Sequence, residues 1–166
     1  MPDTPSAVFS ATCPADIPPP EVFRARSGLD YMKGVLEGRF PMPRLVADMG
    51  MVFTAIEDHR ATLRGAAAFG HTNLFGGVHG GWYGTIMDTA MGCAVMTVVP
   101  QGKWQTTLEY KVNIMRAVRI GTEVEVTGIV DHAGQTTAVA RAEVRGAEDG
   151  RLYATASTTC LILDWR

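Results

Sequence analysis

Residues 73–99 constrain the fold of this chain more than any other stretch. The segment opens with a glycine-rich turn and continues as an apolar run, residues 82–99, in which Asp88 is the single acidic or basic side chain. The run is rich in Met and Ala and has no proline before Pro100, which favours a helix over a strand. A helix that is apolar on all sides is a buried helix. Because glycines and an acid interrupt this short run, it does not predict a membrane span.

Asp88 therefore needs an explanation, because a carboxylate is expensive to bury. It requires either hydrogen-bond partners or a chemical role. On the residue alone, a satisfied structural carboxylate and a catalytic carboxylate explain Asp88 about equally well.

The bulk properties exclude several classes of function. The length of 166 residues predicts one main domain, and the net charge of −2 gives no basis for binding nucleic acid or an acidic membrane surface. Three widely spaced cysteines and four histidines without metal-ligand spacing predict neither a disulfide framework nor a metal site. Fingerprints for nucleotide phosphates and dinucleotides are absent, so no cofactor is expected. The chain start does not resemble a secretion signal, so we expect a cytoplasmic protein.

The N-terminal third is predicted to be irregular around one helix. Residues 1–26 are rich in proline, which favours an extended or flexible arm ahead of a single domain, residues 27–166. Residues 27–37 predict a short amphipathic helix with Ser27 as its N-cap. Pro41 and Pro43 then predict an extended linker over residues 41–49.

The remaining segments predict strands. Residues 51–57 and 61–69 form a candidate hairpin before the glycine-rich turn. After Pro100, segments rich in Val, Thr and Ile alternate with short turns, at residues 103–116, 122–132, 135–145 and 151–163. Short connections imply antiparallel pairing. One buried helix covered by one antiparallel sheet is an α+β arrangement.

A family resemblance rests on three pieces of this pattern. The first is Asn-x-x-Gly-x-x-His-Gly-Gly at residues 73–81, and the second is Asp-Thr-Ala-Met-Gly at residues 88–92 inside the predicted helix. The third is the strand from Thr107 to Arg116. In this order the pieces resemble the hotdog fold, and within it the PaaI-type (phenylacetate-degradation-like) acyl-CoA thioesterases, over about residues 28–163.

The resemblance implies a site and a reaction. It implies hydrolysis of an aryl- or medium-chain acyl-CoA, with Asp88 as general base or nucleophile and the Gly80 N–H as the oxyanion donor. Asn73 would position the thioester or the water, and Thr107 would hold the water. Thr106 adjoins Thr107, so the position of this hydroxyl is uncertain by one residue. The resemblance also implies a homodimer with shared active sites, assembled further into a tetramer.

Helix geometry supports the shared site. Gly80 and Asp88 are eight residues apart, which is roughly 12 Å along one helix axis. A single carbonyl group therefore does not reach both residues in one subunit. With the resemblance, we expect Asn73 and Gly80 of one chain to face Asp88 and Thr107 of the other.

The substrate-binding candidates include residues with a simpler structural explanation. His79 is better explained as a loop histidine that fixes the turn, and Trp82 as a core residue. The full set of candidates is His79, Gly81, Trp82, Thr106 and Arg116.

Two other functions remain open, since a fold does not settle a function. One is a non-catalytic protein that binds or senses acyl-CoA on the same fold. The other, less well supported, is a hydratase or dehydratase.

Overall fold

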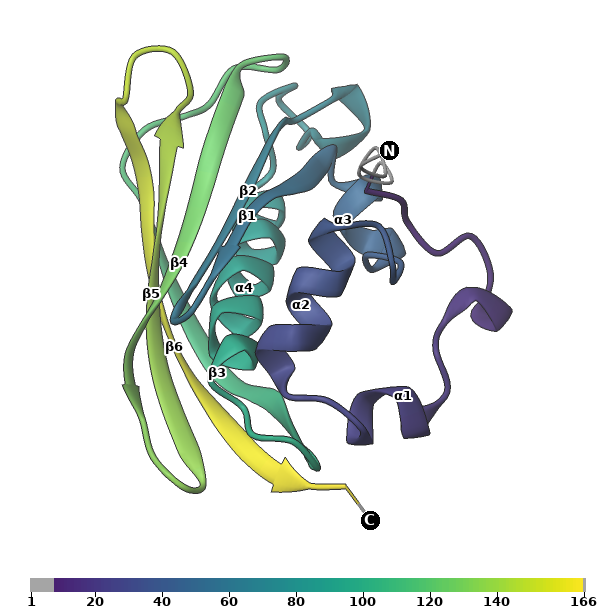
Figure 1. The fold of residues 1–166 in the computed structure, drawn as a ribbon. Helices are drawn as coiled ribbons and strands as arrows, with labels where there is room; N and C mark the ends of the chain where they lie inside the picture. Colours follow the sequence, from purple (N-terminus) through teal and green to yellow (C-terminus); the bar gives the residue numbers. More distant parts are fainter. Residues whose placement is uncertain (1–7, 166) are drawn as a thin grey trace.

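A six-stranded antiparallel sheet curves around the long helix α4, as Figure 1 shows. The computed structural model describes residues 8–165. The helices are η1 (Pro14–Asp16), α1 (Pro20–Arg24), α2 (Gly28–Leu36), α3 (Arg44–Asp48), η2 (Phe69–His71) and α4 (Gly80–Thr97). The strands are β1 (Met51–Glu57), β2 (Arg60–Ala66), β3 (Lys103–Ile114), β4 (Glu123–Ala133), β5 (Thr137–Gly146) and β6 (Leu152–Asp164). The strand order β1-β2-β4-β5-β6-β3 confirms the α+β class and places β1 and β3 at the two sheet edges.

The extended linker expected over residues 41–49 is wrong in its second half, which forms helix α3. A proline restricts the residue before it, but it leaves the following residues free to turn into a helix. Pro43 is the N-cap residue, and Arg44 Nε lies 2.7 Å from Asp48 Oδ1 across one helical turn. This pair supports a helix that the two prolines conceal in the sequence.

The described part of the proline-rich arm, residues 8–26, contains η1 and α1 and arches away from α2 (Figure 1). Its first residues are fixed by backbone hydrogen bonds: the Ala11 N–H donates to Met42 O at 3.1 Å, and the Met42 N–H donates to Phe9 O at 2.8 Å. Residues 1–7 of the expected arm lie outside the described residues.

Helix α4 forms the centre of the core and approaches the sheet closely. Its inward side chains, among them Met87, Met91 and Val95, are fully buried. A Cβ atom added at Gly128 on β4 would lie 2.2 Å from Ala90 O, so the helix backbone rests directly on that strand. Helix α2 covers α4 from the other side, and the Gly28 N–H donates to Val99 O at 2.9 Å. Within residues 8–165, no helix is long and apolar enough to span a membrane.

His79 explains why α4 begins at Gly80. His79 is the N-cap residue, with extended backbone angles of φ −67° and ψ 140°, and its Nδ1 accepts a hydrogen bond from the Gly81 N–H at 2.8 Å. This contact satisfies one of the N–H groups that a helix start leaves without an intrahelical acceptor. The structural explanation of His79 therefore matches its contacts. The N-cap Ser27 of α2 behaves in the same way, because its Oγ accepts from the Asp30 N–H at 3.2 Å.

Gly128→Ala should destabilise the fold. The added methyl group would force α4 away from β4, and overpacking of this kind costs about 3 kcal/mol or more in the free energy of unfolding. Gly70→Ala is the matched control, because a Cβ atom there meets nothing within 4 Å. Urea denaturation should separate the two variants, and equal stability would show that α4 does not rest on β4 as described.

His79→Ala should lower the free energy of unfolding by about 1 kcal/mol, because it removes the side-chain cap of α4. His79→Asn should recover most of this loss, since asparagine is among the preferred N-cap residues. Thermal or urea unfolding measures both variants. A loss in His79→Ala that His79→Asn does not recover would contradict a capping role.

Candidate functional site

Asp88 and Thr107 meet where α4 packs against the edge strand β3. The Thr107 hydroxyl donates a hydrogen bond to Asp88 Oδ1 at 2.9 Å, and both residues are half-buried. Among residues 8–165, no group is in hydrogen-bond contact with the second carboxylate oxygen, Oδ2, which is not buried. The carboxylate is thus held by one oxygen while the other is available to a water molecule or a substrate.

Of the two adjacent threonines, only Thr107 contacts Asp88 among the described residues. Thr107 faces α4, and alternation along the strand turns Thr106 to the opposite face. A β-bulge follows at once: Thr107 pairs with Cys160 and Glu109 pairs with Thr159, so the residue between them has no partner. Bulges of this kind redirect side chains and are common beside active sites.

Helix α4 and strand β3 approach each other closely along one line of helix residues, Gly80, Gly84, Asp88 and Gly92. We call this line, together with its neighbours on β3, the α4–β3 seam. A Cβ atom at Gly80 would lie 3.6 Å from Ile114 Cδ1, and one at Gly84 would lie 3.2 Å from the Tyr110 hydroxyl. Each glycine therefore brings the helix backbone within reach of a β3 side chain.

Gln105 is a further seam residue, one that the sequence reasoning missed. Its Nε2 donates to Gly92 O at 3.1 Å. Its Oε1 is buried and has no hydrogen-bond partner among residues 8–165. Since residues two apart on a strand share a face, its position two residues before Thr107 was a usable signal. Tyr110 gave no such signal, because the bulge after Thr107 changes which residues face the helix.

In the first turn of α4, the Gly80 backbone N–H is without an acceptor among the described residues, whereas its two neighbours are hydrogen-bonded. The Gly81 N–H is taken by His79 Nδ1 and the Trp82 N–H by His79 O. The Gly80 N–H has no acceptor among the described residues, and Gly80 is exposed. Helix starts favour negative charge, so this N–H is suited to the oxyanion role expected for it. Because α4 is one continuous helix, Gly80 still lies roughly 12 Å from Asp88 within the chain.

Asn73 shapes the turn before α4. Its Oδ1 accepts hydrogen bonds from the Phe75 N–H at 2.9 Å and the Gly77 N–H at 3.2 Å. The side chain is exposed, and no acceptor for its Nδ2 is found in the described chain. The amide group could therefore donate to a ligand while its oxygen maintains the turn. Its catalytic role stays a prediction.

Trp82 lies away from the seam. Its side chain is 3% exposed, and its Nε1 donates to Met49 O at 2.9 Å. Six residues along a helix from Asp88, it projects from a different side of α4. The structure places this substrate-binding candidate in the core beneath α3.

Arg116 lies in a polar pocket of about 580 Å³ together with Arg119 and Arg151. Its Nη1 donates to Leu152 O at 2.8 Å, which fixes the side chain. The pocket is close to the start of α4, because the Val118 N–H donates to the Tyr83 hydroxyl at 2.7 Å. Three guanidinium groups and no carboxylate line this pocket, which gives it a positive charge that would suit an anionic group.

The two cysteines nearest the site are poor nucleophiles. Burial, with a smaller contribution from the Asp88 charge, raises the pKa of Cys93 to about 12. Burial also raises the pKa of Cys160. The thiolate is the reactive form of cysteine, so the carboxylate of Asp88 is the stronger candidate. Residues 8–165 hold no group of three or more His, Cys, Asp or Glu side chains that could bind a metal ion.

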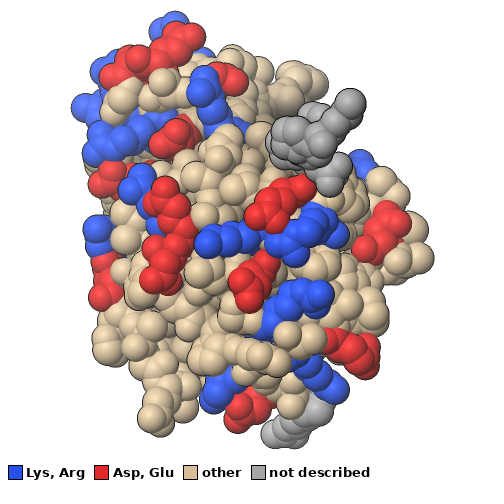
Figure 2. All heavy atoms as spheres, in the orientation of Figure 1, with Lys and Arg blue, Asp and Glu red and all other residues tan. Residues whose placement is uncertain are grey.

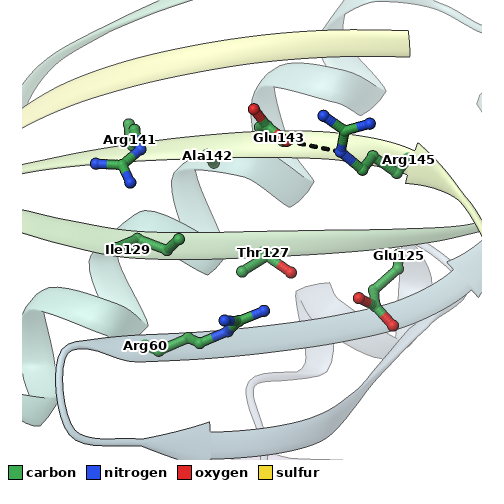
Figure 3. A pocket seen from close by; sticks show the side chains of 8 residues that line it. All are labelled: Arg60, Glu125, Thr127, Ile129, Arg141, Ala142, Glu143 and Arg145. Carbon is green, nitrogen blue, oxygen red and sulfur yellow. Dashed lines mark hydrogen bonds and ion pairs between the residues drawn. The ribbon is translucent and has the colours of Figure 1, made fainter. Parts of the chain in front are cut away.

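A separate polar pocket of about 300 Å³ lies on the sheet face that points away from α4, over β2, β4 and β5 (Figure 3). Arg60, Arg141 and Arg145 line it together with Glu125 and Glu143. Arg145 Nε lies 2.7 Å from Glu143 Oε2. The same mixing of both signs covers the face of the molecule shown in Figure 2. This pocket contains none of the seam residues and no uniform charge.

Known proteins resemble this chain in sequence and in fold. Residues 75–153 match the thioesterase superfamily. Similar solved structures include a conserved protein of Pseudomonas aeruginosa (32% identity, 74% of this chain and 95% of that chain, TM-score 0.67). A thioesterase family protein of Silicibacter pomeroyi is 25% identical over 86% of this chain and 99% of its own, with a TM-score of 0.69.

The PaaI protein of the Escherichia coli phenylacetic acid degradation operon shares the fold at 18% identity, over 72% of this chain and 84% of its own, with a TM-score of 0.66. A curated Caenorhabditis elegans relative, whose name provisionally calls it an esterase, is 31% identical over 93 residues. The match spans 56% of this chain but only about half (54%) of that relative. Residues 75–153 are thus similar to the thioesterase superfamily, and the chain has the hotdog fold of the PaaI-type thioesterases.

Proposed function

We propose that the protein is an acyl-CoA thioesterase that hydrolyses an aryl- or medium-chain acyl-CoA to the free acid and coenzyme A. The observation that carries the proposal is the hydrogen bond from Thr107 to Asp88 Oδ1, which leaves Oδ2 available in the seam. One carboxylate oxygen is thus anchored, and the other is free to bind and activate a water molecule.

The site supports hydrolysis with Asp88 as the general base. Oδ2 takes a proton from a water molecule as the water oxygen attacks the thioester carbonyl carbon. The Thr107 hydroxyl holds the carboxylate and offers its lone pairs to the water. The carbonyl oxygen gains negative charge and accepts a hydrogen bond from a Gly80 N–H. Collapse of the intermediate breaks the carbon–sulfur bond, and the thiolate of coenzyme A leaves and takes up the proton.

Direct attack by Asp88 is compatible with the same residues. Oδ2 would then form an anhydride with the acyl group, and water would hydrolyse it in a second step. Both routes use the free oxygen of Asp88 and the same N–H donor, so the geometry favours neither.

A complete site requires a second chain. The distance between Gly80 and Asp88 along α4 prevents one carbonyl from touching both in a single subunit. Strand β3 lies at a sheet edge and exposes the large apolar side chains of Leu108, Tyr110 and Ile114. An apolar edge strand is a surface that pairs readily with another strand. We therefore propose a homodimer through β3, assembled further into a tetramer.

In this dimer, Gly80 and Asn73 of one protomer would face Asp88 and Thr107 of its partner. The arginine pocket at Arg116, Arg119 and Arg151 would contact the phosphates of coenzyme A. A cytoplasmic location belongs to the same proposal.

Asp88→Asn should lower kcat by about a thousandfold, because it keeps the size of the side chain and removes the base. Free-thiol release from a panel of acyl- and aryl-CoA substrates measures this loss and identifies the preferred acyl group. Thr107→Val should also lower kcat, while Thr107→Ser, which keeps the hydroxyl, should retain most of it.

Full activity of Asp88→Asn would contradict the proposal. So would a wild-type protein that binds acyl-CoA without releasing thiol, which would identify Asp88 as a recognition residue of a binding protein.

A further inference from the structure

The described N-terminal arm, residues 8–26, forms a strap that is fixed to the domain at both ends. At one end, hydrogen bonds join residues 9–11 to Met42. At the other end, the Phe23 ring packs against Tyr31, with centroids 4.6 Å apart, and stacks on Trp165 at 5.9 Å. The middle of the strap therefore bridges two anchored points, and Figure 1 shows it curving away from α2.

The middle of the strap is held in shape by its own hydrogen bonds. Asp16 Oδ2 accepts from the Thr12 N–H and the Thr12 hydroxyl at 2.7 Å each, and from the Cys13 N–H at 3.1 Å. These three contacts close η1 into a tight turn. The shape of the strap thus does not depend on side chains filling the space beneath it.

That space is an apolar cavity of about 650 Å³ between the strap and α2. Hydrophobic side chains and prolines dominate its lining, among them Ile17, Phe23, Met32, Val35, Met42 and Leu45. Arg44 is the only charged residue of the lining among the described residues, and it pairs with Asp48 at 2.7 Å. The cavity opens to solvent on one side, and its size is typical of ligand sites. The chemistry of the lining fits a hydrocarbon group rather than a headgroup.

The cavity reaches the helix that carries Asp88. Cys93 of α4 belongs to its lining and lies five residues beyond Asp88, which is about 7.5 Å along the helix axis. The Asp88 charge adds to the burial that raises the pKa of Cys93 to about 12. Five residues also turn the helix by about 140°, so a hydrocarbon chain starting at a carbonyl beside Asp88 would cross the half-buried side of α4 at Thr89 before it enters the cavity.

We propose that the cavity under the strap binds the distal part of a straight alkyl acyl chain, and that the strap makes the enzyme selective for medium-chain over short-chain acyl groups. The inference rests on the proposed thioesterase function and narrows its substrate. The superfamily match covers residues 75–153, so the strap lies outside the matched segment. The selectivity is therefore a property of what this chain adds to the shared fold.

The test compares kcat/KM for butanoyl-, hexanoyl-, octanoyl- and decanoyl-CoA in the wild type and two variants that fill the cavity, Ile17→Trp and Cys93→Leu. In the wild type, kcat/KM should rise with chain length, by up to about fourfold for each methylene group that becomes buried. Both variants should lose at least about tenfold on decanoyl-CoA while butanoyl-CoA changes less than about twofold. Val52→Trp is the matched control, because Val52 is an exposed aliphatic residue outside the cavity.

An unchanged chain-length profile in both variants would overturn the inference. A binding measurement separates this failure from failure of the proposed function. Calorimetric titration with decanoate should show binding to the wild type and to Val52→Trp, and at least about tenfold weaker binding to Ile17→Trp. If no thiol is released but decanoate binding follows this order, the cavity inference is supported and the thioesterase proposal fails. Equal decanoate binding by all three proteins would overturn the cavity inference.

Discussion

The carboxylate of Asp88 is the constraint on which the arrangement of α4 depends. Most of this helix is surrounded by the sheet and by α2, where an unpaired charge would be costly. Asp88 instead faces the edge strand β3, where Thr107 satisfies one of its oxygens and the other stays accessible. The glycines at positions 80, 84 and 92 continue the same line and let β3 approach the helix. The α4–β3 seam thus contains both the close packing of the helix on the strand and the carboxylate proposed to react.

The packing of α4 against β3 leaves three polar groups or edges without a partner in the described part of the chain. The Gly80 N–H at the start of α4, the free oxygen of Asp88 and the unpaired edge of β3 are all accessible in the single chain. Because the first two are too far apart to act on one carbonyl, the proposed mechanism requires each chain to contribute half of two sites. Pairing of two chains through β3 would complete both half-sites and cover the exposed apolar side chains of that strand.

Most of the fold could be predicted from the sequence, because the periodic segments are long and their turns are marked by glycine and proline. The expected strand at residues 51–57 has the observed bounds of β1, and Ser27 caps α2 as expected. Helix α3 was missed because five residues after two prolines show no periodicity. The cavity under the strap could not be predicted from the sequence, since it depends on the tertiary contacts that fix the two ends of residues 8–26.

The contacts of the candidate site residues could be predicted only in part. The motif directed attention to Asp88 and to the Thr106–Thr107 pair, but only the register of β3 shows which hydroxyl faces the helix. The contact of Tyr110 with α4 could not be predicted, because the bulge changes which residues of β3 face the helix. The contact of Gln105 with α4 could have been predicted from strand alternation, but it was overlooked. Trp82, although included among the substrate-binding candidates, was better explained as a core residue, and the structure places it in the core. Residues in a contiguous motif need not share one side of a helix.

The most direct test of a site shared between two chains is subunit complementation. One subunit carries Asp88→Asn. The other carries Gly80→Pro, which removes the N–H at a position where proline is tolerated, since His79 already has the extended backbone that precedes a proline. Each variant alone should be inactive. Co-expressed with two different tags and purified through both, the mixed protein should regain about a quarter to a half of wild-type thiol release, because one site keeps both groups. A doubly tagged protein as inactive as its parents would contradict the shared site.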